Sequence, residues 1–584
     1  MPEKSQELQE LKKNFLWFYI KQNKGSFTLG MIFLLLTNAL DAFWPLLLKE
    51  AIDLVANRAP AEKITQTAIA FFAMMSGLAI TRYGWRTYFG KYHTYAAEDL
   101  RYRVFHHLTE MGPNFFHKNP IGELMSLIIN DVQAVRQALG HAVLVLFDGI
   151  IISALVLPIM IWMNPSWTWK TMILLPLVPF AIKKIMHLIN IRYKAEQDRQ
   201  AELSGVAQEI AAGIRVIKSY VQEKNRLKYY NQYSKRYEDA ANKTAVVDAV
   251  FEPVMEFGVA TGTVILLFIA TEDIFSGAAT IGTLVAFERY ITKMIWPMTA
   301  IGMGLTQFQK GKASFARICE LLNQDTDIPD NGTEEIRNFE SLEVKNLSYQ
   351  YPGAQTASLH NISFSIKAGQ KVGVVGPVGS GKTTLLHLLN RLYPAPEKSI
   401  LVNGKSIEQI KQKNLHENIV LVPQEPFLFS DSINENLSYG LSQKPEEKEI
   451  HRWAEMVDIR AEIEALPEGF KSQLGERGVN LSGGQKQRLT IARGLMMQAP
   501  FLMLDDALSA VDVKTETEIK RQLKTSHQKN QTQLIVAHRL SSVEDADQII
   551  VLKDGMIESI GSHKDLISKS PTYKKLAEIQ GYPT

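Results

Sequence analysis

Six apolar stretches in the first half of the chain are each long enough to cross a lipid bilayer as a helix. A bilayer core about 30 Å thick is crossed by about 20 helical residues. Lipid offers no partners for backbone hydrogen bonds, so helices are the expected structure of such stretches. Residues 1–321 are therefore predicted to form an α-helical membrane domain of six transmembrane helices, with spans at about residues 26–48, 64–88, 139–163, 167–188, 245–271 and 278–306.

The segments that connect these stretches differ in charge. The third-to-fourth link has no charged residue, and the fifth-to-sixth link carries Glu272 and Asp273. On the other side, the long segments 89–138 and 189–244 are rich in lysine and arginine. Because the cytoplasmic segments of membrane proteins carry the excess of lysine and arginine, these long segments and both termini are predicted to be cytoplasmic. The chain would then be a multi-pass protein of an inner or plasma membrane.

The two long cytoplasmic segments are predicted to continue the spanning helices. They contain few glycine or proline residues, and 20 residues of helix extend about 30 Å. Pro120 and Gly122 interrupt the first segment at 115–124, and the second is interrupted after Gly213. We expect a short transverse helix at each break; the alternative is a solvated stalk without special contacts.

Eight charged residues within the spans are candidates for function, because a charge in lipid is costly. Acidic residues outnumber basic ones among them, which would suit a cavity for cationic amphiphiles. The alternative is that they pair with one another, as Glu288 and Lys293 could, or lie near the interfaces. The residues are Asp41, Asp148, Asp248, Glu252, Glu256, Glu288, Arg289 and Lys293.

A phosphate-binding loop lies in the second half. Residues 376–384 read GPVGSGKTT and follow a β-prone run at 371–375. Glycines let backbone N–H groups turn inward at a helix N-terminus, which favours phosphate oxygens. The lysine can reach the β- and γ-phosphates, and the first threonine can offer its hydroxyl to Mg²⁺. Tyr351, 25 residues upstream, could stack on an adenine ring. The predicted nucleotide-binding residues of the loop are Gly376, Gly379, Ser380, Gly381, Lys382, Thr383 and Thr384.

From about residue 341, short β-prone runs alternate with helix-like runs. Such alternation around a phosphate loop predicts an α/β P-loop domain over residues 341–584. The acidic stretch 322–340, broken by Pro329 and Gly332, is predicted to be a linker. The predicted strands lie near 341–349, 362–366, 371–375, 418–423, 500–505, 531–537 and 548–552.

Polar residues stand at the ends of three of these strands. Asp505 could hold Mg²⁺, together with Thr383 and Gln424. Asp506 could orient or deprotonate an attacking water, and His538 could contact the γ-phosphate. ATP and Mg²⁺ are therefore the expected ligands, with Asp506, His538 and Gln424 as the catalytic candidates.

The ordered set of motifs resembles the ABC transporters of the exporter (type IV) kind, in which six membrane helices are fused to one nucleotide-binding domain. LSGGQ at 481–485 resembles the family's signature loop, VPQ at 422–424 its Q-loop and SAVD at 509–512 its D-loop. His538 takes the place of the switch histidine. The segments GIRVIKSYVQE, FEPV and IWPM also resemble bacterial multidrug half-transporters of the Bmr and Mdl type.

The resemblance implies a dimer, in which each ATP lies between the phosphate loop of one chain and the LSGGQ of the other. Ser482, Gly483, Gly484 and Gln485 would therefore complete the site of a partner half-transporter. The breaks near 115–124 and 206–216 would be the coupling helices. The cargo implied is a small amphipathic compound or a lipid.

Asp506 departs from the family pattern, which has glutamate after the metal-binding aspartate. Aspartate is shorter by one methylene, so its carboxylate is expected to lie more than about 1 Å further from the attacking water, and misplacement on that scale can cost about 10²-fold in rate. In the family this aspartate marks one member of a heterodimer, so a heterodimeric exporter with one impaired site is predicted. The alternatives are a homodimeric lipid flippase, or a regulatory subunit that holds ATP with little hydrolysis.

The composition limits the other partners. The 584 residues carry a formal net charge of only +3, so nucleic acid is not an expected partner. Cys319 is the single cysteine, which excludes an intrachain disulfide and a thiolate zinc site. The charged N-terminal residues lack an apolar core with a cleavage site, so no signal peptide is predicted.

Overall fold

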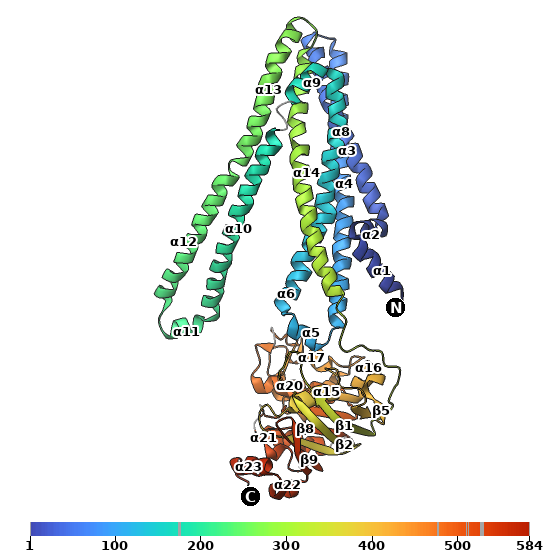
Figure 1. The fold of residues 1–584 in the computed structure, drawn as a ribbon, viewed down its shortest axis with the longest axis vertical. Coiled ribbons are helices and arrows are strands. Elements are labelled where there is room, and N and C mark those ends of the chain that lie inside the picture. Colours follow the sequence, from blue (N-terminus) through green and yellow to red (C-terminus); the bar gives the residue numbers. More distant parts are fainter. Residues whose placement is uncertain are drawn as a thin grey trace. The chain divides into compact units, whose positions relative to one another are not determined.

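The computed structural model describes residues 2–172, 177–475, 478–509, 511, 513–525 and 531–582. They form two compact units, one of Met1–Leu108 with Gly122–Gln324 and one of Thr109–Ile121 with Asp325–Thr584. The described part of the first unit is helical, and the named strands all lie in the second (Figure 1). The predicted fold class, a helical domain followed by an α/β domain, is confirmed.

Long helices form the first unit because its apolar stretches run for many residues, and the helices continue through the prolines inside them, Pro45, Pro158 and Pro297. Four described helices are long and apolar enough to cross a membrane: Lys24–Ala56, Ala61–Thr109, Ile121–Met163 and Glu223–Phe275. They contain the predicted spans at 26–48, 64–88, 139–163 and 245–271. The predicted span at 167–188 includes residues 173–176, which lie outside the described residues, and the span at 278–306 falls largely within a further long helix. The long helices and their neighbours are α1 (Pro2–Lys13), α2 (Phe15–Gln22), α3 (Lys24–Ala56), α4 (Ala61–Thr109), α8 (Val143–Met163), α9 (Pro165–Met172), α10 (Leu177–Ala212), α12 (Glu223–Asp248), α13 (Phe251–Phe275) and α14 (Ile281–Leu322).

Short helices occupy the two predicted breaks. The first contains α5 (Pro113–Lys118) and α6 (Ile121–Ser126), which Pro120 separates, and the second contains α11 (Ile214–Ser219). The predicted interval 206–216 is wrong by several residues, because the chain stays helical to the end of α10. Gly213, a poor helix former, then ends that helix. Beyond α11 the chain returns as α12, which lies beside α10 (Figure 1).

Two π-helical turns interrupt the long helix between α6 and α8. They are Leu127–Asp131 and Ala138–Ala142, and they flank α7 (Val132–Gln137). A π turn generally represents one extra residue in an α-helix. Helix α14 packs along this whole stretch. At the first π turn Arg317 Nε donates to Asp131 (3.1 Å), and at the second His141 Nδ1 lies 3.0 Å from Gln307 Oε1.

Several of the charged residues in the spans are paired. Lys293 Nζ lies 2.5 Å from the Asp41 carboxylate, which Arg82 also approaches at 3.5 Å. The pair suggested for Glu288 and Lys293 is therefore wrong, and Glu288 instead lies 3.4 Å from Arg289. Tertiary packing explains the difference: α3 and α14 pack together, so Lys293 of α14 contacts Asp41 of α3. Elsewhere in the spans, the Asp148 carboxylate accepts hydrogen bonds from Asn38 and Trp296.

Two sheets form the centre of the second unit. In the larger sheet β3 (Lys371–Val375), β8 (Thr532–Val536), β7 (Phe501–Asp505) and β6 (Ile419–Val422) are parallel neighbours in that order. On the other side of β3, β9 (Gln548–Lys553) is also parallel and β10 (Met556–Gly561) is an antiparallel edge. The smaller sheet is antiparallel, in the order β2 (Leu359–Lys367), β1 (Ser341–Tyr349), β4 (Ile400–Val402), β5 (Lys405–Ser406).

The seven predicted strands correspond to β1, β2, β3, β6, β7, β8 and β9, each within three residues of its predicted bounds. Strands β4, β5 and β10 were not predicted. The first two have only three and two residues, too few for a period of two to be recognised. Besides α5, the helices of this unit are α15 (Lys382–Leu389), α16 (Gln412–Asn418), α17 (Ile433–Ser438), α18 (Glu447–Met456), α19 (Arg460–Glu464), α20 (Gly483–Met496), α21 (Val513–Thr525), α22 (His563–Lys569) and α23 (Pro571–Ile579).

The two sheets share one apolar core with α15. Leu342 and Phe364 of the smaller sheet, Val374 and Phe501 of the larger, and Leu386 of the helix are all buried in it. The core fixes the strand ends and the start of α15 relative to one another. That edge of the larger sheet is where the predicted polar residues gather.

Candidate nucleotide site

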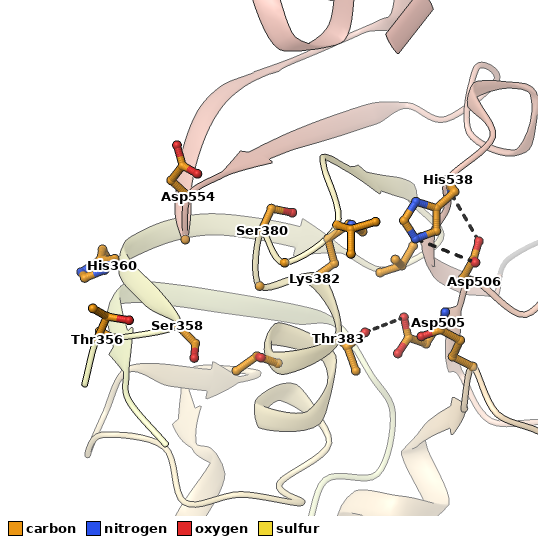
Figure 2. A pocket seen from close by; sticks show the side chains of 18 residues that line it. Thr356, Ser358, His360, Ser380, Lys382, Thr383, Asp505, Asp506, His538 and Asp554 are labelled. Atoms are coloured by element: carbon orange, nitrogen blue, oxygen red, sulfur yellow. Dashed lines mark hydrogen bonds and ion pairs between the residues drawn. The ribbon is translucent and has the colours of Figure 1, made fainter. Parts of the chain in front are cut away.

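Four parallel strands bring the predicted site residues to one edge of the sheet. β3 leads into the phosphate loop, Asp505 ends β7, and His538 and Gln424 follow β8 and β6. Because the carboxyl ends of parallel strands meet at the same edge, these residues converge. They line a pocket of about 610 Å³, which extends from Thr356, Ser358 and His360 at one end to Asp506 and His538 at the other (Figure 2).

The phosphate loop has the backbone that a phosphate cradle requires. Gly379 (φ +81°) and Gly381 (φ +96°) adopt the left-handed region, which side chains rarely tolerate. At Gly381 a Cβ would also lie 2.6 Å from Leu359 Cδ2. The Ser380 hydroxyl is buried in the loop with no hydrogen-bond partner among the described residues. An unpartnered buried hydroxyl in a glycine-rich loop fits a phosphate oxygen.

Lys382 begins α15 and lies against the loop. Its ammonium donates to the carbonyl oxygens of Gly376 and Pro377, each at 2.9 Å. Burial lowers the pKa of this ammonium, and the nearby Asp505 and Asp506 carboxylates oppose that shift. A buried cation that has only carbonyl partners can gain a full charge partner from a nucleotide phosphate.

Asp505 and Thr383 form the part of the site that fits a metal ion. Thr383 Oγ1 lies 3.3 Å from Asp505 Oδ1, and Gln424 lines the same pocket. Burial raises the pKa of the Asp505 carboxyl, and the Thr383 hydroxyl opposes that shift. Among the described residues, no three His, Cys, Asp or Glu side chains are grouped as metal ligands. Mg²⁺ commonly takes one or two protein ligands plus phosphates and waters, so a hydroxyl and one carboxylate fit it.

Asp506 and His538 face each other across the last part of the pocket. Asp506 Oδ1 accepts the His538 backbone N–H at 3.3 Å, and its Oδ2 lies 4.0 Å from His538 Nε2 (Figure 2). Asp506 has φ +46°, a left-handed conformation that aspartate tolerates better than most residues. The backbone and the loop contact therefore both suit a short carboxylate here.

Tyr351 and Gly376 are predicted site residues of this chain's own nucleotide site that do not line the pocket. The Tyr351 hydroxyl lies 3.2 Å from Thr384 Oγ1, and its ring meets the rings of Tyr349 and Tyr393 edge-on. Thr384 itself lines the pocket, so the tyrosine lies one residue away from it. Stacking on adenine stays a prediction for Tyr351.

The LSGGQ residues form the start of α20, outside the lining of the pocket. The Ser482 side chain accepts the Gln485 N–H, and the Gln485 side chain accepts the Ser482 N–H, which makes a capping box. Gln485 Nε2 also donates to Glu462 at 2.7 Å. A Cβ added at Gly483 would meet nothing within 4 Å. Hydrogen bonds thus hold the start of α20, and the space beside Gly483 is open. Of the D-loop residues at 509–512, Ala510 and Asp512 lie outside the described residues.

Gln580 contacts the site and was missed by the sequence analysis. Its Nε2 donates to the His538 carbonyl at 2.8 Å, and its Oε1 accepts the Leu540 N–H at 2.8 Å. Because Asp506 accepts the His538 N–H, the histidine backbone is held on both sides. The two residues are 42 positions apart, and no local pattern marks a glutamine just beyond α23 as part of a distant loop.

We expect Gln580→Ala to lower ATP turnover at the site of this chain's own phosphate loop by about tenfold with little change in the KM for ATP, because it loosens the His538 loop without touching the phosphate loop. Steady-state ATPase assays in which hydrolysis at the other composite site is disabled measure both quantities. Glu578→Ala is the matched control, since Glu578 is an exposed residue of the same helix end. An equal loss in the control, or a loss that only follows thermal stability, would contradict the role.

Comparison with known proteins agrees with this geometry. The model of the ABC transporter transmembrane region matches residues 27–298, and the ABC transporter model matches residues 359–509. The probable multidrug resistance ABC transporter ATP-binding/permease protein YheI of Bacillus subtilis is 35% identical over 97% of both chains. The chain belongs to the ABC transporter family. The predicted resemblance is confirmed, and this transporter is an ATPase that couples hydrolysis to transport across a membrane.

Other relatives of the transporter are named for two kinds of cargo, drugs and lipids. The multidrug resistance-like ATP-binding protein MdlA of Buchnera aphidicola (subsp. Schizaphis graminum) is 36% identical over 97% of this chain and 98% of that protein. The ATP-dependent lipid A-core flippase of Thiobacillus denitrificans is 31% identical over 96% and 97%. Among solved structures, a bacterial Atm1-family ABC exporter with ATP bound has a TM-score of 0.78 at 25% identity, covering 96% of this chain and 99% of that one. The transporter therefore has the exporter fold.

Proposed function

We propose that this chain is one half of a heterodimeric exporter whose own ATP site hydrolyses slowly. Asp506 carries the proposal: it stands where the general base belongs, one methylene shorter than glutamate, and is engaged by the His538 N–H. In this role the phosphate loop holds ATP and keeps the dimer closed. Faster hydrolysis takes place at the other site, which LSGGQ of this chain completes.

The pocket residues then have defined roles. Lys382 binds the β- and γ-phosphates, and the loop amides with Ser380 and Thr384 bind the remaining oxygens. Thr383, Asp505 and Gln424 would hold Mg²⁺, which would neutralise phosphate charge when bound. His538 contacts the γ-phosphate, and Asp506 orients the attacking water and accepts its proton slowly.

We expect Asp506→Glu to raise hydrolysis at this site by about 10- to 100-fold, since it moves the carboxylate back towards the water. The assay uses the complex with the hydrolysis of the partner's site disabled, so that turnover reports this site alone. Asp506→Asn is the control, because it keeps the size and removes the base. Glutamate tolerates φ +46° less well than aspartate, so thermal stability is recorded beside turnover. An unchanged rate in a stable variant would show that the base does not limit this site and would contradict the proposal.

The proposed cargo is a small amphipathic compound, carried by an inner or plasma membrane protein with cytoplasmic termini. Relatives named for multidrug resistance support this choice. A homodimeric lipid flippase is the second candidate, because other relatives are named lipid A-core flippases. The purified chain decides between them: full ATPase from this chain alone, as a two-fold dimer, would favour the flippase and contradict the heterodimer.

A further inference from the structure

A cavity of about 630 Å³ lies between the N-terminal helices and the last turns of α14. Its lining combines three lysines with three phenylalanines: Lys12, Lys13, Lys312, Phe15, Phe308 and Phe315. None of these belongs to the nucleotide site. The volume falls in the range of small-molecule sites, about 300–1,000 Å³.

The polar side of the cavity is basic. Lys12 donates to the Asn323 side chain, a neutral partner. Neither Lys13 nor Lys312 has a carboxylate within ion-pair distance among the described residues. Glu320 is the one acidic residue of the lining, against three lysines. The cavity therefore has an excess of positive charge that the described chain does not compensate.

The opposite side of the cavity is apolar and rigid. Phe15 stacks on Phe315 with ring centroids 4.6 Å apart, and on Phe308 at 6.0 Å. Phe15 and Phe315 are only 6% and 5% exposed, so the wall is part of the packed structure. A small soluble anion would leave this wall unused. A ligand with an anionic head and an apolar tail would use both sides.

The cavity also lies near the expected membrane interface, where ligands with an anionic head and an apolar tail are found. α2 reads FLWFYIKQ and is followed at once by the membrane helix α3. Trp17 on α2 is 56% exposed, and exposed tryptophan beside a span is typical of the membrane interface. The lining residues of α14 lie near its end at Leu322, beyond the predicted span, which indicates the cytoplasmic interface. Basic pockets at that interface bind anionic headgroups.

We propose that this cavity binds an anionic phospholipid of the cytoplasmic leaflet. Its phosphate lies between Lys13 and Lys312, and the start of its acyl chains lies along Phe308 and Phe315. The site is separate from cargo transport and would hold for either candidate function. It would couple the end of α14 to the membrane surface.

Cys319 supplies a test that needs no engineered cysteine. It is the only cysteine in the chain, it is half-buried, and it lines the cavity. The full-length chain, with its partner subunit, is placed in nanodiscs of phosphatidylcholine or of phosphatidylcholine with one quarter phosphatidylglycerol. The rate of maleimide labelling of Cys319 is then measured on the separated chain. We expect phosphatidylglycerol to slow the labelling of Cys319. Each lysine removed from the lining is expected to lower the apparent affinity for the lipid by about fivefold.

Lys312→Glu is expected to abolish this protection, and Lys312→Gln to weaken it. Lys310→Glu is the matched control: it makes the same charge change two residues away on α14, outside the lining. Glu320→Gln is expected to act in the opposite direction and strengthen protection. The ATPase of each variant confirms folding.

Three outcomes would overturn the proposal. Equal labelling in the two lipid mixtures would show that no anionic lipid covers Cys319. An equal effect of Lys310→Glu and Lys312→Glu would show attraction to a charged surface rather than a site. Protection by glycerol phosphate in phosphatidylcholine discs would show a site for soluble anions.

Discussion

Gly483→Asp is expected to reduce ATP turnover of the complex by about 100-fold or more while the fold stays intact. Gly483 is the first residue of α20, and its Cβ position is open within the chain. An acidic residue in the first turn of a helix favours the helix, so the substitution does not weaken the unit. Its carboxylate would instead face the γ-phosphate held by the partner and repel it. Steady-state ATPase and thermal unfolding of the complex measure the two effects.

The control for this variant is Gly483→Ala, which fills the same position without charge. We expect a much smaller loss, because nothing in the chain lies within 4 Å of the added methyl group. If alanine and aspartate reduce turnover equally, steric exclusion rather than charge explains the loss. If aspartate leaves turnover unchanged, this glycine does not face a phosphate, and LSGGQ of this chain does not complete the fast site.

Lys382→Ala is expected to weaken ATP binding to this chain by about 10- to 100-fold, as expected for loss of a charge-assisted hydrogen bond. The ammonium already lies over the loop, bonded to the Gly376 and Pro377 carbonyls, where it can reach a bound phosphate. Photolabelling of each chain with an ATP analogue measures the binding separately. Lys471→Ala, at an exposed lysine of the same unit that does not line the pocket, is the control.

The comparison of the two variants tests the assembly. In a heterodimer, Lys382→Ala removes only the slow site, so turnover of the complex falls less than tenfold, whereas Gly483→Asp stops the fast site. In a homodimer both sites are identical, and the two substitutions reduce turnover to a similar extent. Similar losses would therefore contradict a heterodimer.

The sequence alone predicted much of the fold, because the relevant signals are local. Runs of apolar residues marked the long helices, and buried runs such as 371–375 and 501–504 marked the central parallel strands. Strands β4 and β5 were missed because β4 is held by pairing with β1, and β5 by pairing with β4, rather than by a pattern of their own. The break after Gly213 was predicted correctly, but the interval 206–216 for the second coupling helix begins too early, because helix propensity before Gly213 carries α10 to Ala212.

In the nucleotide site, too, residues with a local sequence signal were predicted, and residues placed by tertiary packing were not. The phosphate loop, Asp505, Asp506 and His538 each follow a recognisable strand, so their convergence could be predicted from the parallel order. Gln580 could not, because its role depends on how α23 packs beside a loop 42 residues away. The Asp41–Lys293 pair was missed for the same reason, since the residues are 252 positions apart. Contacts that depend on tertiary packing have no signature in a short window.

The two π turns that flank α7 change which side chains of their helix lie on the same face, because each adds one residue to the helix. Each α-helical residue turns the chain by about 100°, so one extra residue rotates everything beyond it by that angle. Asp131 in the first turn contacts Arg317 of α14, and His141 in the second contacts Gln307 of the same helix. Deleting one residue from either turn would leave a regular α-helix. The residues beyond the deletion would then be rotated by about 100°, so that other side chains would face α14.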